Sequence, residues 1–309
     1  KRTRGVLRPQ GPMNNNLAAR FSLPGLLRAA REIKAQGSPA VFKSAVLYSY
    51  FRLFFLGLYG GGGKIVEAAG FKVKYCTVES LLYLFREIFI DQSYWFTAET
   101  PRPFIIDCGA NIGMASLYFK ALYPAAEILA FEPDPDAFAC LGENIRLNGL
   151  SGIEIKNKAL MGAAGETELY ASKSGPGSLL VSVLRARADG PARKVPAAKL
   201  SEYITRPVDL LKIDIEGAET EALLELRASG RLSMVKRLIM EYHHHIDKAA
   251  DSLSEILGAL ESSGFGYQLG GSLERPFHAG QFQNILIYSY NKTSQAMTSG
   301  RISRCRNIL

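Results

Sequence analysis

The spacing of hydrophobic positions changes near residue 104 and divides the chain into two parts. From there on, short apolar runs alternate with segments in which apolar residues recur every three or four positions. The runs predict β-strands and the spaced segments predict amphipathic helices. Strands are expected at 104–106, 128–131, 153–155, 208–213, 235–240, 265–269 and 284–288, and helices at 114–122, 135–149, 218–226 and 252–264.

Two of these helices carry recognisable start signals. Asp134 is expected to cap the helix whose first turn holds Pro135, because a short acceptor side chain satisfies free backbone N–H groups and proline loses no helical bond there. Ser252 and Glu255 have the spacing of a capping box.

The part before residue 104 is mainly helical in pattern. Residues 17–58 have helical spacing, and four glycines at 60–63 then break the chain. A short strand is expected at 71–75 and a helix at 79–89. The predicted organisation is a basic, helical N-terminal extension over 1–62, a larger domain over 63–290 and a basic tail over 291–309.

Strands that alternate with helices predict parallel βαβ units and therefore an α/β fold with a doubly wound, mostly parallel sheet. Such sheets bind ligands beyond the carboxyl ends of their strands. The glycine-containing interval 160–207 interrupts the alternation. We expect it to hold a β-hairpin at 167–171 and to form part of the wall around a substrate.

Composition and charge are those of a globular protein. Of 309 residues, 47% are hydrophobic and 21% are charged. The net charge of +8 comes from the two ends, because residues 1–16 and 291–309 each carry four basic and no acidic residues. The nearly neutral remainder predicts no nucleic-acid partner, whereas a basic end leaves weak contact with an anionic membrane surface open.

The cysteines and the apolar segments favour a cytoplasmic location. Cys76, Cys108, Cys140 and Cys305 form no closely spaced pair, so reduced thiols are expected. The apolar stretch 46–59 is interrupted by a charge and is shorter than the ~20 residues that cross a bilayer. No signal peptide is recognised in the sequence.

The first candidate motif is Asp107-Cys108-Gly109-Ala110-Asn111-Ile112-Gly113, between the strand at 104 and its helix. Glycines allow a sharp turn and a close approach of backbone to ligand. The acid at its start would repel a diphosphate but would suit a cationic amino-acid ligand, which argues against the Gly-x-Gly-x-x-Gly dinucleotide pattern.

The second motif is Glu132-Pro133, at the end of the next strand. A carboxylate there can accept both hydroxyls of a ribose, which indicates a nucleoside but not which one.

Two further motifs follow the strands at 208 and 235. Lys212-Ile213-Asp214-Ile215-Glu216-Gly217 places two acids and a lysine at a strand end, and Glu241-Tyr242-His243 places a histidine at the next. Buried charges are costly unless paired, so these residues are either a site or a structural salt bridge of Lys212. Histidine is suited to proton transfer near neutral pH.

Together these motifs resemble the FkbM family of methyltransferases. Asp107 to Gly113 is similar to the family's D-x-G-A-N-x-G, and Lys212 to Gly217 is similar to its K-I-D-x-E-G. Glu132-Pro133, the segment from Asn157 to Leu160 and Glu241-Tyr242-His243 match the remaining family motifs, and Glu87 and Tyr94 fit the segment before the first strand. Cys108 stands where the family often has valine.

The resemblance implies a Rossmann-like class I methyltransferase fold with a seven-stranded sheet and S-adenosylmethionine as cofactor. It implies methyl transfer to a hydroxyl of a sugar or secondary-metabolite acceptor. The cofactor-binding residues that it implies are Tyr94, Asp107, Gly109, Ala110, Asn111, Gly113, Glu132, Pro133, Lys158, Ala159 and Asp214. His243 is the expected general base, with Asp214 or Glu216 as its partner.

Several alternatives stay open on sequence alone. Asp214, Glu216 and His243 could instead hold a divalent metal ion, although their spacing is not typical of a metal site. A non-catalytic nucleoside-binding scaffold and an NAD-dependent oxidoreductase are the other candidate classes. An RNA amino-methyltransferase is disfavoured, because no Asn-Pro-Pro-Tyr segment follows the strand at 208.

Overall fold

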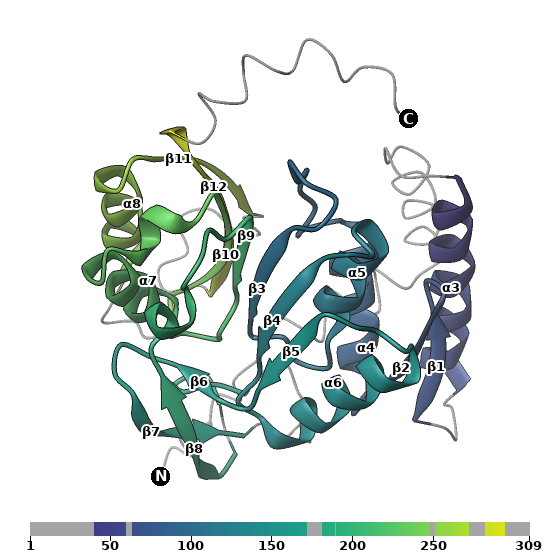
Figure 1. Ribbon diagram of the computed structural model, residues 1–309. Coiled ribbons are helices and arrows are strands. Elements are labelled where there is room, and N and C mark those ends of the chain that lie inside the picture. The colour runs from purple at the N-terminus through teal and green to yellow at the C-terminus, as the bar shows by residue number, and fades with distance from the viewer. Residues whose placement is uncertain are drawn as a thin grey trace, which may run out of the picture.

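The computed structural model describes residues 40–59, 64–171, 181–188, 190–246, 251–271 and 282–293. Its centre is a seven-stranded sheet in the order β11-β12-β10-β9-β3-β4-β5 (Figure 1). Neighbouring strands are parallel except on the two sides of β12, where they are antiparallel. The strands are β3 (Phe104–Cys108), β4 (Glu127–Phe131), β5 (Ile153–Lys156), β9 (Leu210–Ile213), β10 (Arg237–His244), β11 (Phe265–Gly271) and β12 (Gln283–Asn291).

All seven strands expected from the sequence are present, with ends that differ by a few residues. β9 is buried at every position, as expected for a parallel strand covered on both faces. The doubly wound, mostly parallel α/β fold is therefore confirmed.

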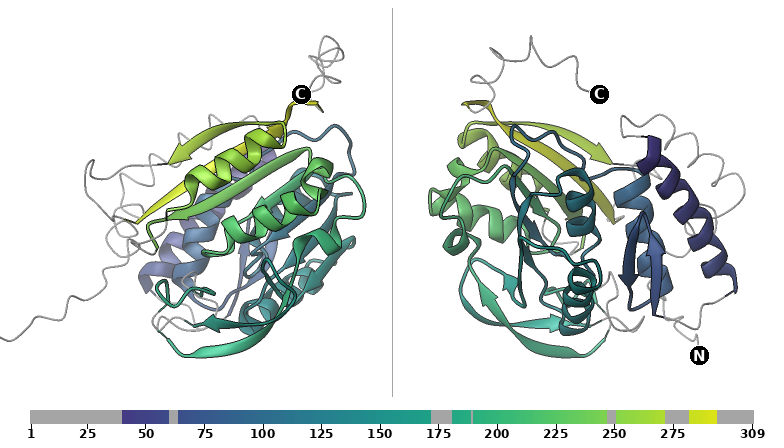
Figure 2. Two further views of the ribbon diagram at one scale, coloured as in Figure 1. Left: turned by 90° about the vertical axis from the view of Figure 1, so that its left-hand side faces the viewer. Right: turned by 45° about the vertical axis from the view of Figure 1, so that its right-hand side comes forward.

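Helices cover both faces of the sheet, as Figures 1 and 2 show. Ile105 and Ile106 of β3 point to opposite faces and belong to two separate hydrophobic cores. The core around Ile105 includes residues of α4 (Val78–Phe85), α5 (Met114–Leu122) and α6 (Pro135–Leu147). The core around Ile106 includes residues of α7 (Glu219–Ala228) and α8 (Leu253–Ser262).

Only one of the two expected helix caps forms. The Asp134 side chain accepts a hydrogen bond from the backbone N–H of Asp136 at 3.2 Å, which confirms the cap. Ser252 precedes α8 but makes no capping bond with its side chain, so the predicted capping box is wrong. The backbone N–H of Ser252 instead donates to the Tyr242 hydroxyl at 2.8 Å.

The N-terminal part packs against α4 and shares its hydrophobic core. α3 (Ala40–Tyr59) buries Val46, Tyr50 and Leu53 in the same core as α4. β1 (Ile65–Ala68) and β2 (Phe71–Lys74) pair antiparallel beside it. The expectations for 17–39 and for the glycines at 60–63 lie outside the described residues. Among the helices described, none has the length and apolar character needed to span a bilayer.

The interval 160–207 forms a small separate sheet, and here the predicted hairpin is wrong. β7 (Gly165–Tyr170) pairs antiparallel with β8 (Ala192–Ala198), and β8 pairs parallel with β6 (Ala159–Leu160). The strand near 167–171 exists, but its partner lies more than twenty residues further along the chain. Sequence patterns report local turns well and distant pairings poorly, which explains the error.

The described residues also include three short helical turns: η1 (Arg86–Ile90), η2 (Leu200–Tyr203) and η3 (Arg231–Met234). η1 is a π-helical turn that continues α4, and such turns are frequent at functional sites.

Two cysteines that are distant in sequence meet in the fold. The Sγ atoms of Cys76 and Cys140 lie 3.2 Å apart, where the start of α4 faces α6. The sequence spacing suggested no cysteine pair, because spacing reveals only local pairs.

Candidate active site

A pocket lies beyond the carboxyl ends of β3, β4 and β9, and its volume with the open mouth is about 840 Å³. This is where a doubly wound sheet binds its ligands. Its lining includes these residues implied by the family resemblance: Tyr94, Gly109, Ala110, Asn111, Glu132, Pro133, Lys158, Ala159, Asp214 and Glu216. Val181, Ser182 and Val183 line it too, so the interval 160–207 supplies part of the wall.

Asp107 and Gly113 are the two implied cofactor residues that do not line this pocket. Asp107 is fully buried and accepts a hydrogen bond from the Ser116 hydroxyl at 2.8 Å. Gly113 has φ 89°, and a Cβ there would lie 2.6 Å from the Leu141 side chain. Both residues therefore support the turn after β3 without lining the pocket.

Gly109 allows two loops to touch. With φ 81°, it lies so close to the loop after β9 that a Cβ would be 1.7 Å from the Asp214 carbonyl oxygen. No side chain fits in that space, so the turn after β3 and the turn after β9 form one continuous backbone surface.

Lys212 ties the same two loops together electrostatically. Its Nζ donates to the Gly109 carbonyl at 2.7 Å and lies 3.4 Å from the carboxylates of both Asp107 and Asp214. Burial alone lowers the pKa of Lys212, but Asp214 and Asp107 outweigh it and raise the pKa above its usual range. The salt bridge considered for Lys212 is therefore present, and it positions Asp214 in the pocket wall.

Glu132 is buried and held in place by backbone groups. Its two carboxylate oxygens accept from the N–H of Asn111 at 2.7 Å and of Asp134 at 2.8 Å. Burial raises the pKa of Glu132 to about 8, although these two hydrogen bonds lower it. A carboxylate kept in this costly position is typical of a binding site.

Asp214 also contacts an aromatic wall. The Tyr94 hydroxyl donates to its Oδ2 at 3.1 Å, and the Lys212 Nζ lies 5.2 Å from the Tyr94 ring centre. Burial and the nearby Asp214 raise the pKa of Tyr94 well above its usual range, so the hydroxyl stays a donor.

His243 lies among carboxylates, but its closest partner is one that the sequence analysis missed. Its Nδ1 is 2.8 Å from Oε1 of Glu219, whereas its Nε2 is 3.4 Å from Glu216 and 3.8 Å from Asp214. Glu219 also accepts the backbone N–H of Gly217 at 2.9 Å. The available signal was an acid in the first turn of a helix directly after the Lys212–Gly217 motif.

The carboxylates around His243 control its protonation. Burial alone lowers the pKa of His243, but Glu216, Glu219 and Glu241 outweigh burial and raise the pKa to about 10. The ring therefore carries a proton at neutral pH, with each nitrogen facing a carboxylate.

A second acid pair lies next to this cluster. Burial and then the neighbouring Glu241 raise the pKa of Glu87 well above its usual range, and burial and Asp214 raise the pKa of Glu241 to about 7. Asn284 donates to Glu241 from β12. Glu87 comes from the π-helical turn η1, so its place beside Glu241 could not be read from local spacing.

Arg187 is another residue that the sequence analysis missed. Its Nε donates to Glu216 Oε2 at 2.9 Å, and its guanidinium lies 4.2 Å from the centre of the Phe282 ring. It arrives from the interval 160–207, whose sequence shows no motif around it.

The metal alternative has partial geometric support. Ligand atoms of Asp214, Glu216 and His243 lie within 4.8 Å of one another. However, Lys212 and Arg187 already contact the two acids. Positive charge next to the carboxylates weakens their attraction for a divalent cation.

Comparison with known proteins agrees with this geometry. Residues 107–269, more than half of the chain, match the family model described as the Methyltransferase FkbM domain. Methyltransferase sdnD of Sordaria araneosa is 37% identical over 174 residues, which cover 46% of this chain and 67% of that protein.

One further relative and one solved structure carry the family's name. The 31-O-demethyl-FK506 methyltransferase FkbM of Streptomyces tacrolimicus is 27% identical over 215 residues, covering 59% of this chain and 81% of that protein. The crystal structure of Methyltransferase FkbM from Methylobacillus flagellatus KT aligns with 89% of this chain and 60% of its own, with a TM-score of 0.44 and 13% identity.

The match over residues 107–269 includes all four strand-end motifs, from Asp107 to His243, although Asp107 and His243 do not themselves line the pocket. The chain therefore belongs to the FkbM methyltransferase family.

Proposed function

We propose that the pocket binds S-adenosylmethionine and that the protein transfers its methyl group to a hydroxyl oxygen of a sugar or secondary-metabolite acceptor. The observation that carries this proposal is the buried carboxyl group of Glu132 in the pocket wall, which accepts from Asn111 in the same turn as the contact between Gly109 and Asp214. The family membership supplies the reaction type.

The chemistry of the lining fits this cofactor. Glu132 can accept from ribose hydroxyls, and Asp214 offers negative charge to a cationic amino-acid portion. Phe131, Leu160 and Val183 add apolar walls suited to a purine ring. A diphosphate would meet Asp214 and Glu216 in the pocket wall, which disfavours the NAD-dependent alternative.

When bound, S-adenosylmethionine supplies a methyl group that its sulfonium has already activated. The chain's own task is then to orient the acceptor, exclude water and remove the proton of its hydroxyl. His243 is the proposed proton acceptor, through Nε2, which faces the Asp214 and Glu216 side of the cluster. Glu219 holds the other ring nitrogen and fixes the orientation of the ring.

Oxygen as the methylated atom is supported by the name of the Streptomyces relative, which specifies a 31-O position. The identity of the acceptor is open to a screen. Radiolabelled S-adenosylmethionine and a panel of sugars, hydroxylated macrolides and matching amines would show which class accepts the methyl group. Transfer to amines alone would contradict the proposal.

A titration of the full chain with S-adenosylhomocysteine tests cofactor binding separately. We expect one molecule bound per chain in calorimetry. Absence of binding would overturn the cofactor assignment, and binding without any release of labelled product would instead support the non-catalytic scaffold alternative.

The pH dependence tests the role of His243. Because a base must lose its proton first, and the pKa of His243 is raised to about 10 in the free protein, kcat/KM should rise with pH from 7 towards 10. His243→Ala should slow turnover by roughly 100-fold and remove this rise while S-adenosylhomocysteine affinity stays near normal. A wild-type rate independent of pH, or full activity of the variant, would reject the assignment.

A further inference from the structure

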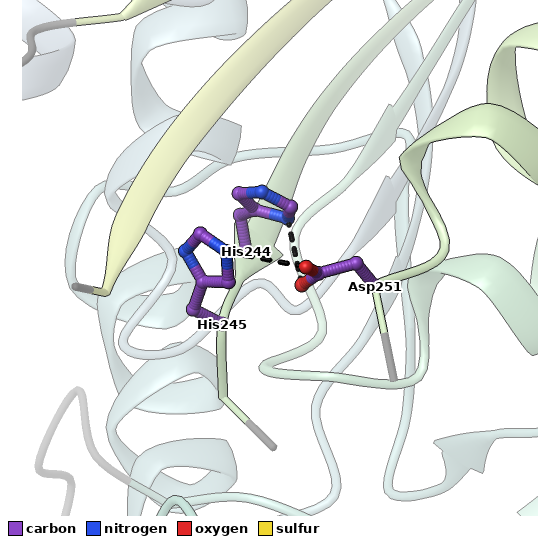
Figure 3. Close-up of side chains that lie close together, drawn as sticks. All are labelled: His244, His245 and Asp251. Carbon is purple, nitrogen blue, oxygen red and sulfur yellow. Dashed lines mark ion pairs between the residues drawn. The ribbon is translucent and has the colours of Figure 1, made fainter. Parts of the chain in front are cut away.

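A second cluster of potential ligands lies at the end of β10, one residue beyond His243. It consists of His244, His245 and Asp251 (Figure 3). His244 is the last residue of β10, and Asp251 stands two residues before the start of α8. None of the three lines the pocket described above.

The backbone brings two consecutive histidines to the same side. In a strand, neighbouring side chains point to opposite faces. His245 has φ 62°, a left-handed conformation that a non-glycine residue seldom adopts. The turn ends the alternation of the strand, and the two imidazole rings lie with centroids 3.8 Å apart. Such a conformation persists only where the surroundings enforce it.

A separate hydrogen bond brings Asp251 to the two rings. The backbone N–H of Ser252 donates to the Tyr242 hydroxyl at 2.8 Å, which fixes the start of α8 against the end of β10. Asp251 then has one carboxylate oxygen 3.2 Å from His244 Nδ1 and the other 3.2 Å from His245 Nε2. Figure 3 shows both contacts converging on the same carboxylate.

The spacing of the three side chains is compatible with a shared metal ion. Zinc binds histidine nitrogen and carboxylate oxygen at about 2.0–2.2 Å, so two ligand atoms of a tetrahedron lie roughly 3.3 Å apart. Each ring nitrogen lies 3.2 Å from a different Asp251 oxygen, and one ligand atom from each of the three side chains lies within 4.8 Å of the other two.

The charge of the cluster also favours a cation. Within the part of the chain that the structure describes, the ion pairs of Asp251 are those with the two histidines. At the catalytic cluster, by contrast, Lys212 and Arg187 contact Asp214 and Glu216.

We propose that His244, His245 and Asp251 form a binding site for a divalent transition metal ion of the zinc type. His244 Nδ1, His245 Nε2 and one Asp251 oxygen would be its protein ligands. The Asp251 side chain is 46% exposed, so water can complete the coordination. The ion would cross-link the end of β10 and the start of α8, directly beside His243. It would stabilise the folded state by binding to it preferentially.

The test uses the full chain without an affinity tag, stripped with a chelator and titrated with Zn²⁺ in a calorimeter. We expect one ion per chain and a higher melting temperature with Zn²⁺ than without. Asp251→Asn and His245→Gln should each lower the affinity at least about 100-fold, since even the loss of an outer-shell partner costs 10–100-fold. Replacement by Co²⁺ should give the intense visible absorption of a tetrahedral ion, and Asp251→Asn should lose it.

Glu216→Gln is the matched control, because Glu216 belongs to the other candidate cluster. It should leave Zn²⁺ affinity unchanged. Loss of binding in Glu216→Gln with retention in Asp251→Asn would place the ion at the catalytic cluster and overturn the proposal. No uptake by the wild-type chain, or equal uptake by all variants, would overturn it as well. Circular dichroism of each variant separates lost binding from lost folding.

Discussion

At Glu132, a single carboxylate performs two tasks. It satisfies the N–H groups of Asn111 and Asp134, and so shapes the turn after β3 from the end of β4. Each oxygen retains further acceptor capacity, which leaves it able to bind the hydroxyls of a ligand. The buried position that raises its pKa to about 8 is the energetic cost of this arrangement.

We expect Glu132→Gln to lower the affinity for S-adenosylhomocysteine by about 10-fold, because the amide replaces one acceptor oxygen by a donor and a lost hydrogen bond costs ~1–3 kcal/mol. The measurement is calorimetric titration. Glu143→Gln is the control, since Glu143 is an acid of α6 that pairs with Arg146 away from the pocket. Equal affinities of wild type and Glu132→Gln would remove Glu132 from the cofactor site.

At the scale of elements, the pocket depends on the contact between the loop after β3 and the loop after β9. Gly109 makes this contact possible, and Lys212 holds it through the Gly109 carbonyl and Asp214. The two strands are neighbours in the sheet, so their adjacent carboxyl ends place both loops at one edge.

Gly109→Ala should therefore destabilise the protein by more than backbone strain alone. Gly230→Ala is the matched control, because Gly230 has φ 75° but a Cβ there would meet no heavy atom within 4 Å. The control should cost ~1–2 kcal/mol, and Gly109→Ala roughly 1–3 kcal/mol more because of steric overlap. Urea unfolding measures both, and equal costs would disprove the role of the close approach.

The contact between Cys76 and Cys140 joins the start of α4 to α6. The thiol of Cys76, with Lys74 and Lys64, lowers the pKa of Cys140 to about 7 against the effect of burial. A thiolate beside a thiol at 3.2 Å is well placed for oxidation to a disulfide.

Mild oxidation with diamide should thus link Cys76 to Cys140, which peptide mass spectrometry would detect. Cys140→Ser should abolish this link and Cys108→Ser should retain it, since Cys108 is fully buried in the other core. A product linking Cys76 to a different cysteine would contradict the described contact.

At the scale of the whole molecule, the site makes stability depend on pH in one direction. Folding raises the pKa of His243 to about 10, of Glu132 to about 8 and of Glu241 to about 7. In each case the folded state holds a proton that the unfolded chain has released. The free energy of unfolding therefore falls as pH rises.

We expect the melting temperature of the ligand-free protein to decrease from about pH 5 to pH 10. The stabilisation from the raised carboxyl pKa values is lost between the usual pKa near 4.5 and about 8. The stabilisation from His243 is lost between about pH 6.5 and 10. Calorimetry in buffers of equal ionic strength would measure it, and Glu241→Gln should flatten the acidic part of the slope. A melting temperature that rises from pH 6 to pH 9 would contradict the protonation states given for these groups.

The order of strands and helices was predictable because each element leaves a local signal. Parallel strands such as β9 are continuous apolar runs; Asp107 ends the apolar run of β3, and Glu132 and Asp214 stand directly after β4 and β9. Since the carboxyl ends of parallel strands share an edge, sequence position alone brought Glu132 and Asp214 together. The sequence thus determined the fold class, the family and most of the pocket lining.

Only the tertiary structure decided which groups touch across long distances in the chain. Glu219 rather than Asp214 or Glu216 is the closest partner of His243, Glu87 meets Glu241 from a π-helical turn, and β7 pairs with a distant β8. The rings of His244 and His245 lie next to each other because the φ angle of His245 is not that of a strand. These features depend on packing and on single dihedral angles, which leave no periodic pattern in a sequence.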